Sequence, residues 1–336
     1  MTKTMKAAQI HKYKQHHLEL NQVAIPAVGD DDVLVKVAAA SINPIDLKTR
    51  DGRLTMLLKY KMPLTLGSDF SGTVTQVGQN VKAFSVGDQV YGRVQKNRIG
   101  TFAEYIAVDQ GDVALKPSNL NFEQAASVPL TGLTSYQALV DIMHVKPGDK
   151  LLIQAGSGGI GTIAIQIAKS LGAFVATTTS RKNIEMVRKL GADQVIDYHQ
   201  ENFEDVLFNY DFVFDTLGGK ALENVFKIIK PGGKVVSLSG IPNGRFAAEY
   251  GLPLWKRLAF SLATLNISKL ERETKAQYVF LFMKPSGAEL NLITKMIEDG
   301  AVMPMIDRVV PFSEIQSALD YSETGRAHGK IIVTMD

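Results

Sequence analysis

Three glycines in one short stretch are spaced in a way that suits the binding of a pyrophosphate. Gly156, Gly158 and Gly161 form the pattern G-x-G-x-x-G, directly after the apolar residues KLLIQA and directly before an apolar stretch typical of a helix. The first glycine then permits a tight turn, the second lets the backbone approach a phosphate, and the third allows close packing of helix on strand. The N–H groups at the start of the helix attract the phosphate charge. The pattern predicts a dinucleotide site that also includes Gly159 and Ile160, and the alternative is a glycine turn without a ligand.

The residues after the second predicted strand indicate which dinucleotide binds. A site for NAD usually carries an Asp or Glu there, whereas the 2′-phosphate of NADP is served by a basic or hydroxyl side chain. Thr179, Ser180 and Arg181 occupy this region, in the sequence TTTSRKN, and no acid does. A guanidinium can hold a phosphate through two hydrogen bonds. The sequence therefore favours NADPH, and the alternative is that Arg181 and Lys182 only begin a solvated helix.

The elements around the glycine motif predict a parallel, doubly wound sheet, so the fold class is α/β. Apolar strands alternate with helices from residue 150 to residue 240, and this alternation is typical of such sheets. We expect several strands there and a further one over residues 277–283, with the sequence QYVFLFM. The residues between them, 241–275, are expected to be irregular.

A second, β-rich domain is predicted before residue 124, where short apolar segments are separated by Gly-Asp, Asn-Pro and Gly-rich turns. After the doubly wound region, the patterns predict two helices and a final strand that can return to the first domain. The dinucleotide domain would then be an insertion. The predicted boundaries are 1–123 for the first domain, 124–284 for the dinucleotide domain and 285–336 for the tail.

The composition excludes several kinds of function. The chain has 336 residues, 45% hydrophobic and 21% charged, which indicates a globular protein. The net charge of +3 comes without a run of like charges, so no nucleic-acid partner is predicted. The absence of cysteine excludes disulfides, thiolate nucleophiles and cysteine-bound zinc. Residues 1–20 show no apolar core of a signal peptide, and 151–168 carry glycines and polar side chains, so we expect a cytoplasmic protein without a membrane partner.

Several longer motifs together resemble one protein family. They include ASINPIDLKTRDG, PLTLGSDFSGTVTQVGQNVKAFSVGDQVYG, AASVPLTGLTSYQAL, RKLGADQVIDY and GRAHGKIIV. Over essentially its whole length the chain resembles the zinc-free quinone and enone oxidoreductase branch of the medium-chain dehydrogenase/reductase superfamily. The resemblance implies a GroES-like catalytic domain, completed by the C-terminal tail, and an inserted Rossmann domain that binds NADPH.

The resemblance also shows where zinc would bind in the metal-dependent members of the superfamily. Their first two zinc-ligand positions correspond here to Asn43 and Ser68, and the lobe with four zinc-binding cysteines is missing. Zinc needs three or four ligands in tetrahedral geometry, and the six histidines of this chain show no such spacing. No metal site is therefore predicted, and a zinc alcohol dehydrogenase is disfavoured.

Without a metal to polarise a carbonyl group, hydride must go to an acceptor that is already electrophilic, such as a quinone or an α,β-unsaturated carbonyl compound. A donor for the developing oxyanion is then needed. The resemblance implies Lys48 in this role and, more weakly, Tyr60, while the alternatives are a surface lysine and a packing tyrosine. Asp46 is expected to be a structural partner in the same turn. The predicted function is NADPH-dependent quinone or enone reduction, and the alternative is an NADPH-binding redox sensor or structural protein with little turnover.

Further cofactor contacts are implied by the resemblance or by position at the end of a strand. Leu217, Gly218 and Ser239 follow predicted strands, and doubly wound sheets bind ligands at those ends. Tyr198 matches a position that contacts the 2′-phosphate in related reductases. The remaining contacts that the resemblance implies are Asn43 and Thr131 near the nicotinamide half of the cofactor, Lys48, and the tail residues Arg326, Gly329 and Lys330.

Two stretches bear on partners and substrate. Residues 277–283 contain no proline or charge, and such an apolar strand needs covering if it lies at a sheet edge. Pairing with a symmetry mate would give a homodimer with a closed contact. Residues 241–275, with the only tryptophan, Trp255, are rich in apolar side chains. They are expected to form either the wall or lid of an apolar substrate pocket or a helical cap.

Overall fold

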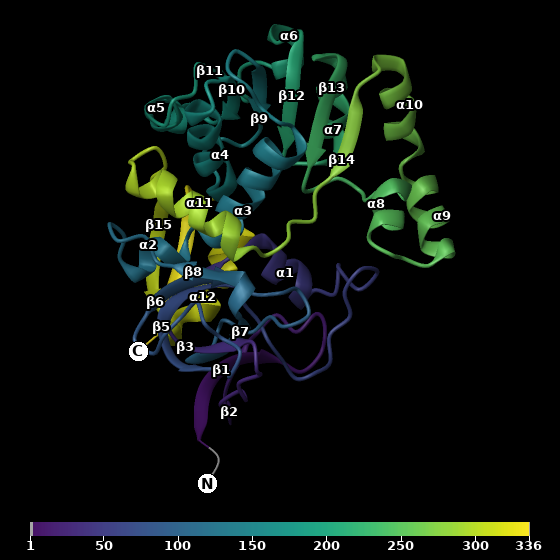
Figure 1. The fold of residues 1–336 in the computed structure, drawn as a ribbon. Coiled ribbons are helices and arrows are strands. Elements are labelled where there is room, and N and C mark those ends of the chain that lie inside the picture. Colours follow the sequence, from purple (N-terminus) through teal and green to yellow (C-terminus); the bar gives the residue numbers. More distant parts are fainter. Residues whose placement is uncertain (1–2, 336) are drawn as a thin grey trace. The chain divides into compact units, whose positions relative to one another are not determined.

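The computed structural model describes residues 3–335, which form two compact units that are described separately (Figure 1). The first unit contains the residues up to Leu133 and those from Lys284 onwards, and the second contains Thr134–Met283. The chain leaves the first unit later than the predicted boundary at residue 124. The reason is that α2 (Phe122–Ala126) packs on two strands of the first unit, β3 (Asp32–Ile42) and β5 (Asp69–Val77).

Strands from residues 32–115 and strands from the C-terminal tail together form the main sheet of the first unit. Within residues 3–335 its strand order is β15-β16-β3-β5-β6-β8, with β7 paired to β3. The tail strand β16 (Lys330–Thr334) runs antiparallel to β3, with Ile331 opposite Ile42. This confirms that the tail returns to the first domain. A smaller sheet has the order β2-β1-β4.

The sequence did not reveal β15 (Ile306–Pro311), which pairs parallel to β16. None of its residues is buried, so the apolar alternation that marks a strand is missing. The other strands of this unit are β1 (Thr4–Ile10), β2 (Glu19–Ala24), β4 (Leu64–Thr65), β6 (Gln89–Arg93), β7 (Tyr105–Asp109) and β8 (Val113–Leu115). The helices are α1 (Pro44–Arg50), α2, α11 (Gly287–Glu298) and α12 (Ile315–Glu323), while α3 (Pro129–Tyr136) runs from this unit into the next.

The second unit is built on a parallel sheet with the strand order β11-β10-β9-β12-β13-β14. This order confirms the predicted doubly wound fold. The order turns back between β9 and β12, and ligands of such sheets bind at that switch point, beyond the carboxyl ends of the strands. The strands are β9 (Lys150–Ile153), β10 (Phe174–Thr179), β11 (Gln194–Asp197), β12 (Tyr210–Asp215), β13 (Ile229–Ser237) and β14 (Gln277–Phe280). Helices α4 (Gly159–Ser170), α5 (Ile184–Lys189), α6 (Phe203–Val206) and α7 (Gly219–Asn224) connect them.

The prediction that residues 241–275 are irregular was wrong. They form α8 (Gly244–Glu249), α9 (Leu254–Ala263) and α10 (Leu265–Thr274). Gly251 and Pro253 lie between α8 and α9, and Thr264 alone lies between α9 and α10, so no long helical pattern marks this stretch in the sequence. Ile267 and Leu270 of α10 pack on the core of the unit, which fits the helical-cap alternative for this part of the stretch. No residue of α9 is buried, and a role of α9 as wall or lid stays a prediction.

The expected strand over residues 277–283 is shorter than predicted, because the ladder with β13 ends at Phe280. No helix within residues 3–335 is long and apolar enough to cross a membrane.

Candidate cofactor-binding and active site

The glycine turn lies between β9 and α4, as predicted, and two of its glycines are required by packing within the protein. A Cβ atom on Gly156 would lie 2.1 Å from Thr177 Oγ1, and one on Gly161 would lie 2.4 Å from the carbonyl oxygen of Ala155. A Cβ atom on Gly158 would meet only that same carbonyl oxygen, at 3.3 Å. The middle glycine is therefore the one whose bare backbone is left for a ligand.

The start of α4 suits an anion. Gly158 is the N-cap residue, so no side chain caps the helix and its first amide groups remain available. Gly159 and Ile160 supply two of these amides, and the helix is twelve residues long. The orphan N–H groups and the helix dipole together attract a pyrophosphate. This bare cradle fits the dinucleotide that the sequence predicts.

The predicted 2′-phosphate clamp is brought together beside this turn. The N–H of Tyr198 donates to the carbonyl oxygen of Thr179 (3.3 Å), so the loop after β11 lies against the loop after β10. Tyr198 is 57% exposed and Arg181 is exposed. No ion pair of Arg181 is present within residues 3–335. Thr179 is buried and its hydroxyl donates to Ser157 (3.0 Å), so this side chain holds the glycine turn itself.

A pocket of about 450 Å³ opens at the carboxyl ends of β9 to β12. Tyr198 and Leu217, both more than half exposed, line it together with the fully buried Gln154. Neither polar atom of the Gln154 side chain has a hydrogen-bond partner in the described chain, so a polar ligand group can pair with it. Gln154 was not among the residues predicted from the sequence, although a glutamine at the end of an otherwise apolar strand is the signal that marks it.

Asp215 shapes the loop after β12. Its Oδ1 accepts hydrogen bonds from the N–H groups of Leu217 (3.1 Å) and Gly218 (2.9 Å). Gly218 has a φ of +72°, and a Cβ atom there would lie 2.6 Å from the carbonyl oxygen of Ser239. Ser239 donates in turn to the carbonyl oxygen of Thr216 (2.8 Å). The structure thus brings Leu217, Gly218 and Ser239 together at one edge of the sheet, as expected.

In the first unit, Lys48 lies on the short helix α1. Its side chain is half-buried, and burial, with the nearby Arg53 charge, lowers its pKa from the ordinary lysine value. The structure gives Lys48 no carboxylate partner within residues 3–335. An ammonium group in this state can donate a hydrogen bond to a developing negative charge.

Tyr60 has a different environment. Its hydroxyl donates to the carbonyl oxygen of Lys96 (2.6 Å), its N–H donates to the Tyr13 hydroxyl (2.9 Å), and its ring packs on the core. The hydroxyl proton is thus already used within the unit. The packing alternative describes Tyr60 better than the role of a donor to substrate.

Comparisons with known proteins identify the family. Residues 29–118 match the model of the alcohol dehydrogenase GroES-like domain, and residues 190–333 match that of the zinc-binding dehydrogenases. The chain is 36% identical to a 2-methylene-furan-3-one reductase of Solanum lycopersicum, over 94% of this chain and 74% of that protein. It is 36% identical to a chloroplastic NADPH-dependent alkenal/one oxidoreductase of Arabidopsis thaliana, over 94% and 75%. The quinone oxidoreductase of Coxiella burnetii superposes with a TM-score of 0.85 at 32% identity, over 99% of this chain and 100% of that one.

The chain belongs to the zinc-free quinone and enone oxidoreductase branch of the medium-chain dehydrogenase/reductase superfamily. It is an oxidoreductase, and its cofactor is NADPH. The second unit is the Rossmann domain of this family, and the first unit is the GroES-like domain.

Two other residues that the family resemblance implied as cofactor contacts, Thr131 and Gly329, have contacts inside the first unit. The hydroxyl of Thr131 donates to the carbonyl oxygen of Ser127 (2.9 Å). Gly329 is buried at a φ of +101°, and a Cβ atom there would lie 2.5 Å from the carbonyl oxygen of Met305. Packing alone therefore requires this glycine. Arg326 is exposed, and its contact with the cofactor stays a prediction.

The predicted cofactor contacts of Asn43 and Lys330 are not supported by the structure. Both side chains are at most 5% exposed. The Asn43 amide donates to the carbonyl oxygen of Ser41 (3.2 Å) and to Asp69 (3.1 Å), and it accepts from the Lys330 ammonium. Because all these groups are used in the interior of the unit, these two side chains act inside the domain.

Asp46 is the structural partner that the sequence predicts. One carboxylate oxygen accepts the N–H of Asn43 (2.9 Å) and the other accepts the Ser68 hydroxyl (3.0 Å), so the side chain caps α1. Burial raises the pKa of Asp46 to about 7, against the lowering effect of these hydrogen bonds. Within residues 3–335, no group of three His, Asp or Glu side chains is placed to hold a metal ion.

Proposed function

We propose that the protein transfers hydride from NADPH to an α,β-unsaturated carbonyl compound or a quinone, without a metal. The observation that carries this proposal is the combination of a bare glycine cradle with a 2′-phosphate loop that holds Arg181 and no acid. The relatives are named as reductases of such acceptors, which supports the same class of substrate here.

The residues of the chain have two tasks in this reaction. Gly158 and the start of α4 hold the pyrophosphate, and NADPH, when bound, supplies the hydride. Addition of hydride to a conjugated acceptor leaves an enolate or quinolate, whose negative charge is spread onto oxygen. Lys48 is proposed to stabilise this oxygen through its ammonium group, because a preorganised positively charged donor stabilises negative charge that develops in the transition state. The final proton comes from a side chain or from water.

The test of this function is a reduction assay with the purified full chain. A panel of enones, quinones and saturated carbonyl compounds is offered with NADPH or NADH, and oxidation of the cofactor is followed by absorbance. We expect turnover of the conjugated acceptors with NADPH and little with NADH. Equal rates with the two cofactors would contradict the proposed specificity, and tight binding of NADPH without turnover on any acceptor would favour the sensor hypothesis.

Arg181→Ala is expected to weaken NADPH binding by roughly ten- to a hundredfold, because one charge-assisted contact to the 2′-phosphate is lost. NADH binding should change little, since NADH has no such phosphate. The measurement is a fluorescence titration with each cofactor. The neighbouring Lys182→Ala serves as the control, and an equal loss in both variants would show that Arg181 has no special contact.

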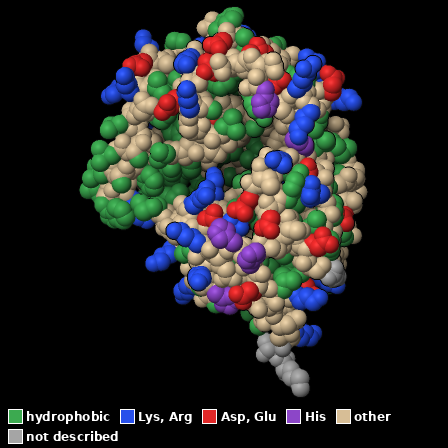
Figure 2. Space-filling model, turned by 180° about the vertical axis from the view of Figure 1, so that it is seen from behind, with side chains coloured by type: hydrophobic (Ala, Val, Ile, Leu, Met, Phe, Trp, Pro, Cys, Tyr) green, Lys and Arg blue, Asp and Glu red, His purple; other side chains and the backbone are tan. Residues whose placement is uncertain are grey.

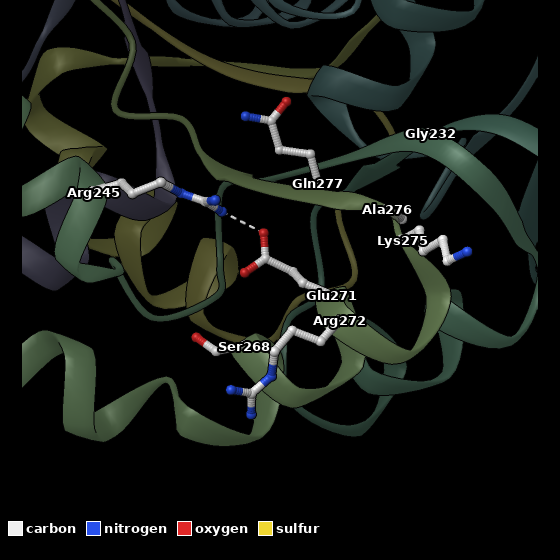
Figure 3. A pocket seen from close by; sticks show the side chains of 8 residues that line it. All are labelled: Gly232, Arg245, Ser268, Glu271, Arg272, Lys275, Ala276 and Gln277. Carbon is white, nitrogen blue, oxygen red and sulfur yellow. Dashed lines mark hydrogen bonds and ion pairs between the residues drawn. The ribbon is translucent and has the colours of Figure 1, made fainter.

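We also propose that the protein forms a homodimer through the outer edge of β14, the last strand of its sheet. Part of this edge is already used. The N–H of Tyr278 donates to Glu271 (2.8 Å), and its carbonyl oxygen accepts from Arg245 (3.0 Å). Figure 3 shows Arg245 and Glu271 paired in an open pocket beside the strand. Pairing with a second copy would therefore begin at Phe280, whose backbone groups point to the same side as those of Tyr278.

An exposed apolar stripe offers a second copy more surface to bury. Hydrophobic side chains gather on the second unit over α8 and α9 (Figure 2). The helix α8 is tied to β14, since the ring centroids of Phe246 and Phe280 lie 5.0 Å apart. Large exposed apolar patches commonly mark interaction surfaces. The side chains of the stripe, each more than half exposed, are Leu254, Trp255, Leu258, Leu262 and Leu265.

Phe280→Pro is expected to convert the dimer to a monomer. Proline removes the outward N–H donor but leaves the ladder to β13 in place, which uses the alternate residues. The measurement is the molar mass by light scattering at micromolar concentration. Phe280→Ala keeps the N–H group and should remain dimeric, and a wild-type chain that is itself monomeric would contradict the proposal.

The cytoplasmic location that the sequence predicts is likewise a proposal. Fractionation of cells with an antibody to the full chain tests it.

A further inference from the structure

A cluster of four charged side chains is buried in the first unit, next to the start of α1. Asp46, Asp69, Arg93 and Lys330 are each at most 5% exposed, and their formal charges balance. Buried charges are costly unless they are paired and hydrogen-bonded. Each of these four buried charges therefore depends on its neighbours in the cluster for compensation.

Lys330 supplies the cation at the centre of the cluster. Its ammonium donates to the side-chain oxygen of Asn43 and to the carbonyl oxygen of Ile42 (3.2 Å). It also lies 3.9 Å from Asp69 Oδ2, the atom that accepts hydrogen bonds from the Ser41 hydroxyl (2.9 Å) and from Asn43. The Lys330 ammonium and the Asn43 side-chain amide thus orient each other, and both lie next to Asp69 Oδ2.

The second acid joins this cluster to the helix. Asp46 accepts from the N–H of Asn43 and from Ser68, the two residues that stand at the zinc-ligand positions of the metal-dependent relatives. The side-chain amide of Asn43 is engaged by Asp69 and Lys330, and the Ser68 hydroxyl by Asp46, so these groups do not fit a tetrahedral zinc ion, which needs three or four ligands. The place of a metal is thus taken by side chains that satisfy one another.

We propose that the buried cluster around Lys330 positions α1 and, through it, Lys48. The helix has only seven residues. Its first turn is held by Asp46, and at its last residue the buried Arg50 pairs with Asp51 and with Glu323 of α12. Lys48 lies between these two anchors. Lys330, Asn43 and Asp46 are thus positioning residues, and their effect on turnover rests on the proposed reductase function.

The first measurement compares Lys330→Met with the double variant Lys330→Met/Asp69→Asn. The single variant removes one of the two cations that face Asp69 and leaves only Arg93, so its thermal unfolding midpoint should fall. The double variant removes both charges, and its midpoint should recover most of that loss. If the midpoint of the double variant falls further than that of Lys330→Met, the two substitutions act independently and the proposed charge pairing is overturned.

The second measurement separates positioning from stability. Single-turnover reduction at saturating NADPH should be slower by roughly tenfold or more in the double variant, although its stability has recovered, because Asn43 still lacks its donor. NADPH affinity should stay within about threefold, since the cradle lies in the other unit. A rate that recovers together with stability would overturn the positioning role.

Two further readouts complete the test. Amide hydrogen exchange of α1 should be faster in Lys330→Met, and unchanged exchange would count against the cluster as the anchor of α1.

Asp32→Asn, which breaks the ion pair with Arg98 in the same unit, is the matched control and should lower stability without slowing reduction. Stoichiometric zinc in the purified wild type would contradict the conclusion that Asn43 and Ser68 do not fit a metal ion. If no acceptor is reduced, the reductase proposal fails. The unfolding and exchange data still test whether the charges of the cluster pair and whether the cluster anchors α1.

Discussion

Lys48→Met is expected to lower turnover of an enone or quinone by roughly a hundredfold or more, with NADPH affinity unchanged within about threefold. The substitution keeps the length of the side chain but removes the ammonium group that would face the developing oxyanion. The cradle at Gly158 is not altered. The measurement is kcat with a saturating acceptor, together with a fluorescence titration of NADPH.

A matched control for this variant is Lys59→Met, which removes an exposed lysine of the same unit and should leave kcat unchanged. The dependence on pH gives an independent readout. Because burial and Arg53 lower the pKa of Lys48, turnover should fall as the pH rises through this lowered value, below the ordinary range of lysine. Lys48→Arg should move this fall to higher pH. A wild-type rate in Lys48→Met would remove Lys48 from the mechanism.

Gly158→Ala is expected to weaken NADPH binding by roughly ten- to a hundredfold while the Rossmann domain stays folded. The backbone of Gly158 has a φ of −79°, which any residue can adopt, and the added Cβ atom meets only one protein atom, at 3.3 Å. The loss would therefore come from the approach of the pyrophosphate. A fluorescence titration and a thermal unfolding curve measure the two effects separately.

Gly161→Ala provides the contrast. Its Cβ atom would lie 2.4 Å from the carbonyl oxygen of Ala155, so this variant should lose stability as well as binding. If Gly158→Ala binds NADPH as tightly as the wild type, the backbone there does not contact the phosphate.

The parts of the site that the sequence predicts well are those where local pattern and chemistry coincide. An apolar strand, three spaced glycines and an apolar helix define one compact unit, so the turn at Gly156 needs no information from elsewhere in the chain. The acid-free loop at Arg181 is equally local. The return of the tail strand also followed from pattern, because 329–335 did not continue the alternation of strands and helices.

The parts that were missed depend on what a side chain meets in three dimensions. Lys330 lies in a motif that the resemblance implied to reach the cofactor, yet its side chain points into the interior. Which side of the sheet a side chain of β16 faces depends on the pairing of β16 with β3, and the local sequence does not contain that information. Gln154 became notable only because its amide is buried without a partner. Within α8, α9 and α10 only Ala247 is buried, so the apolar periodicity that marks a core-facing helix is weak there.

The pairing of the tail with β3 has a consequence for how the chain matures on the ribosome. The contact between Lys330 and Ile42 spans 288 positions of sequence, and the whole Rossmann domain is made between the two partners. That domain has all its strands before the tail emerges, and domains generally fold as units during synthesis. The GroES-like sheet must instead wait with an incomplete edge along β3. A nascent chain arrested before residue 330 should therefore bind NADPH and still be held by chaperones through its unfinished first domain.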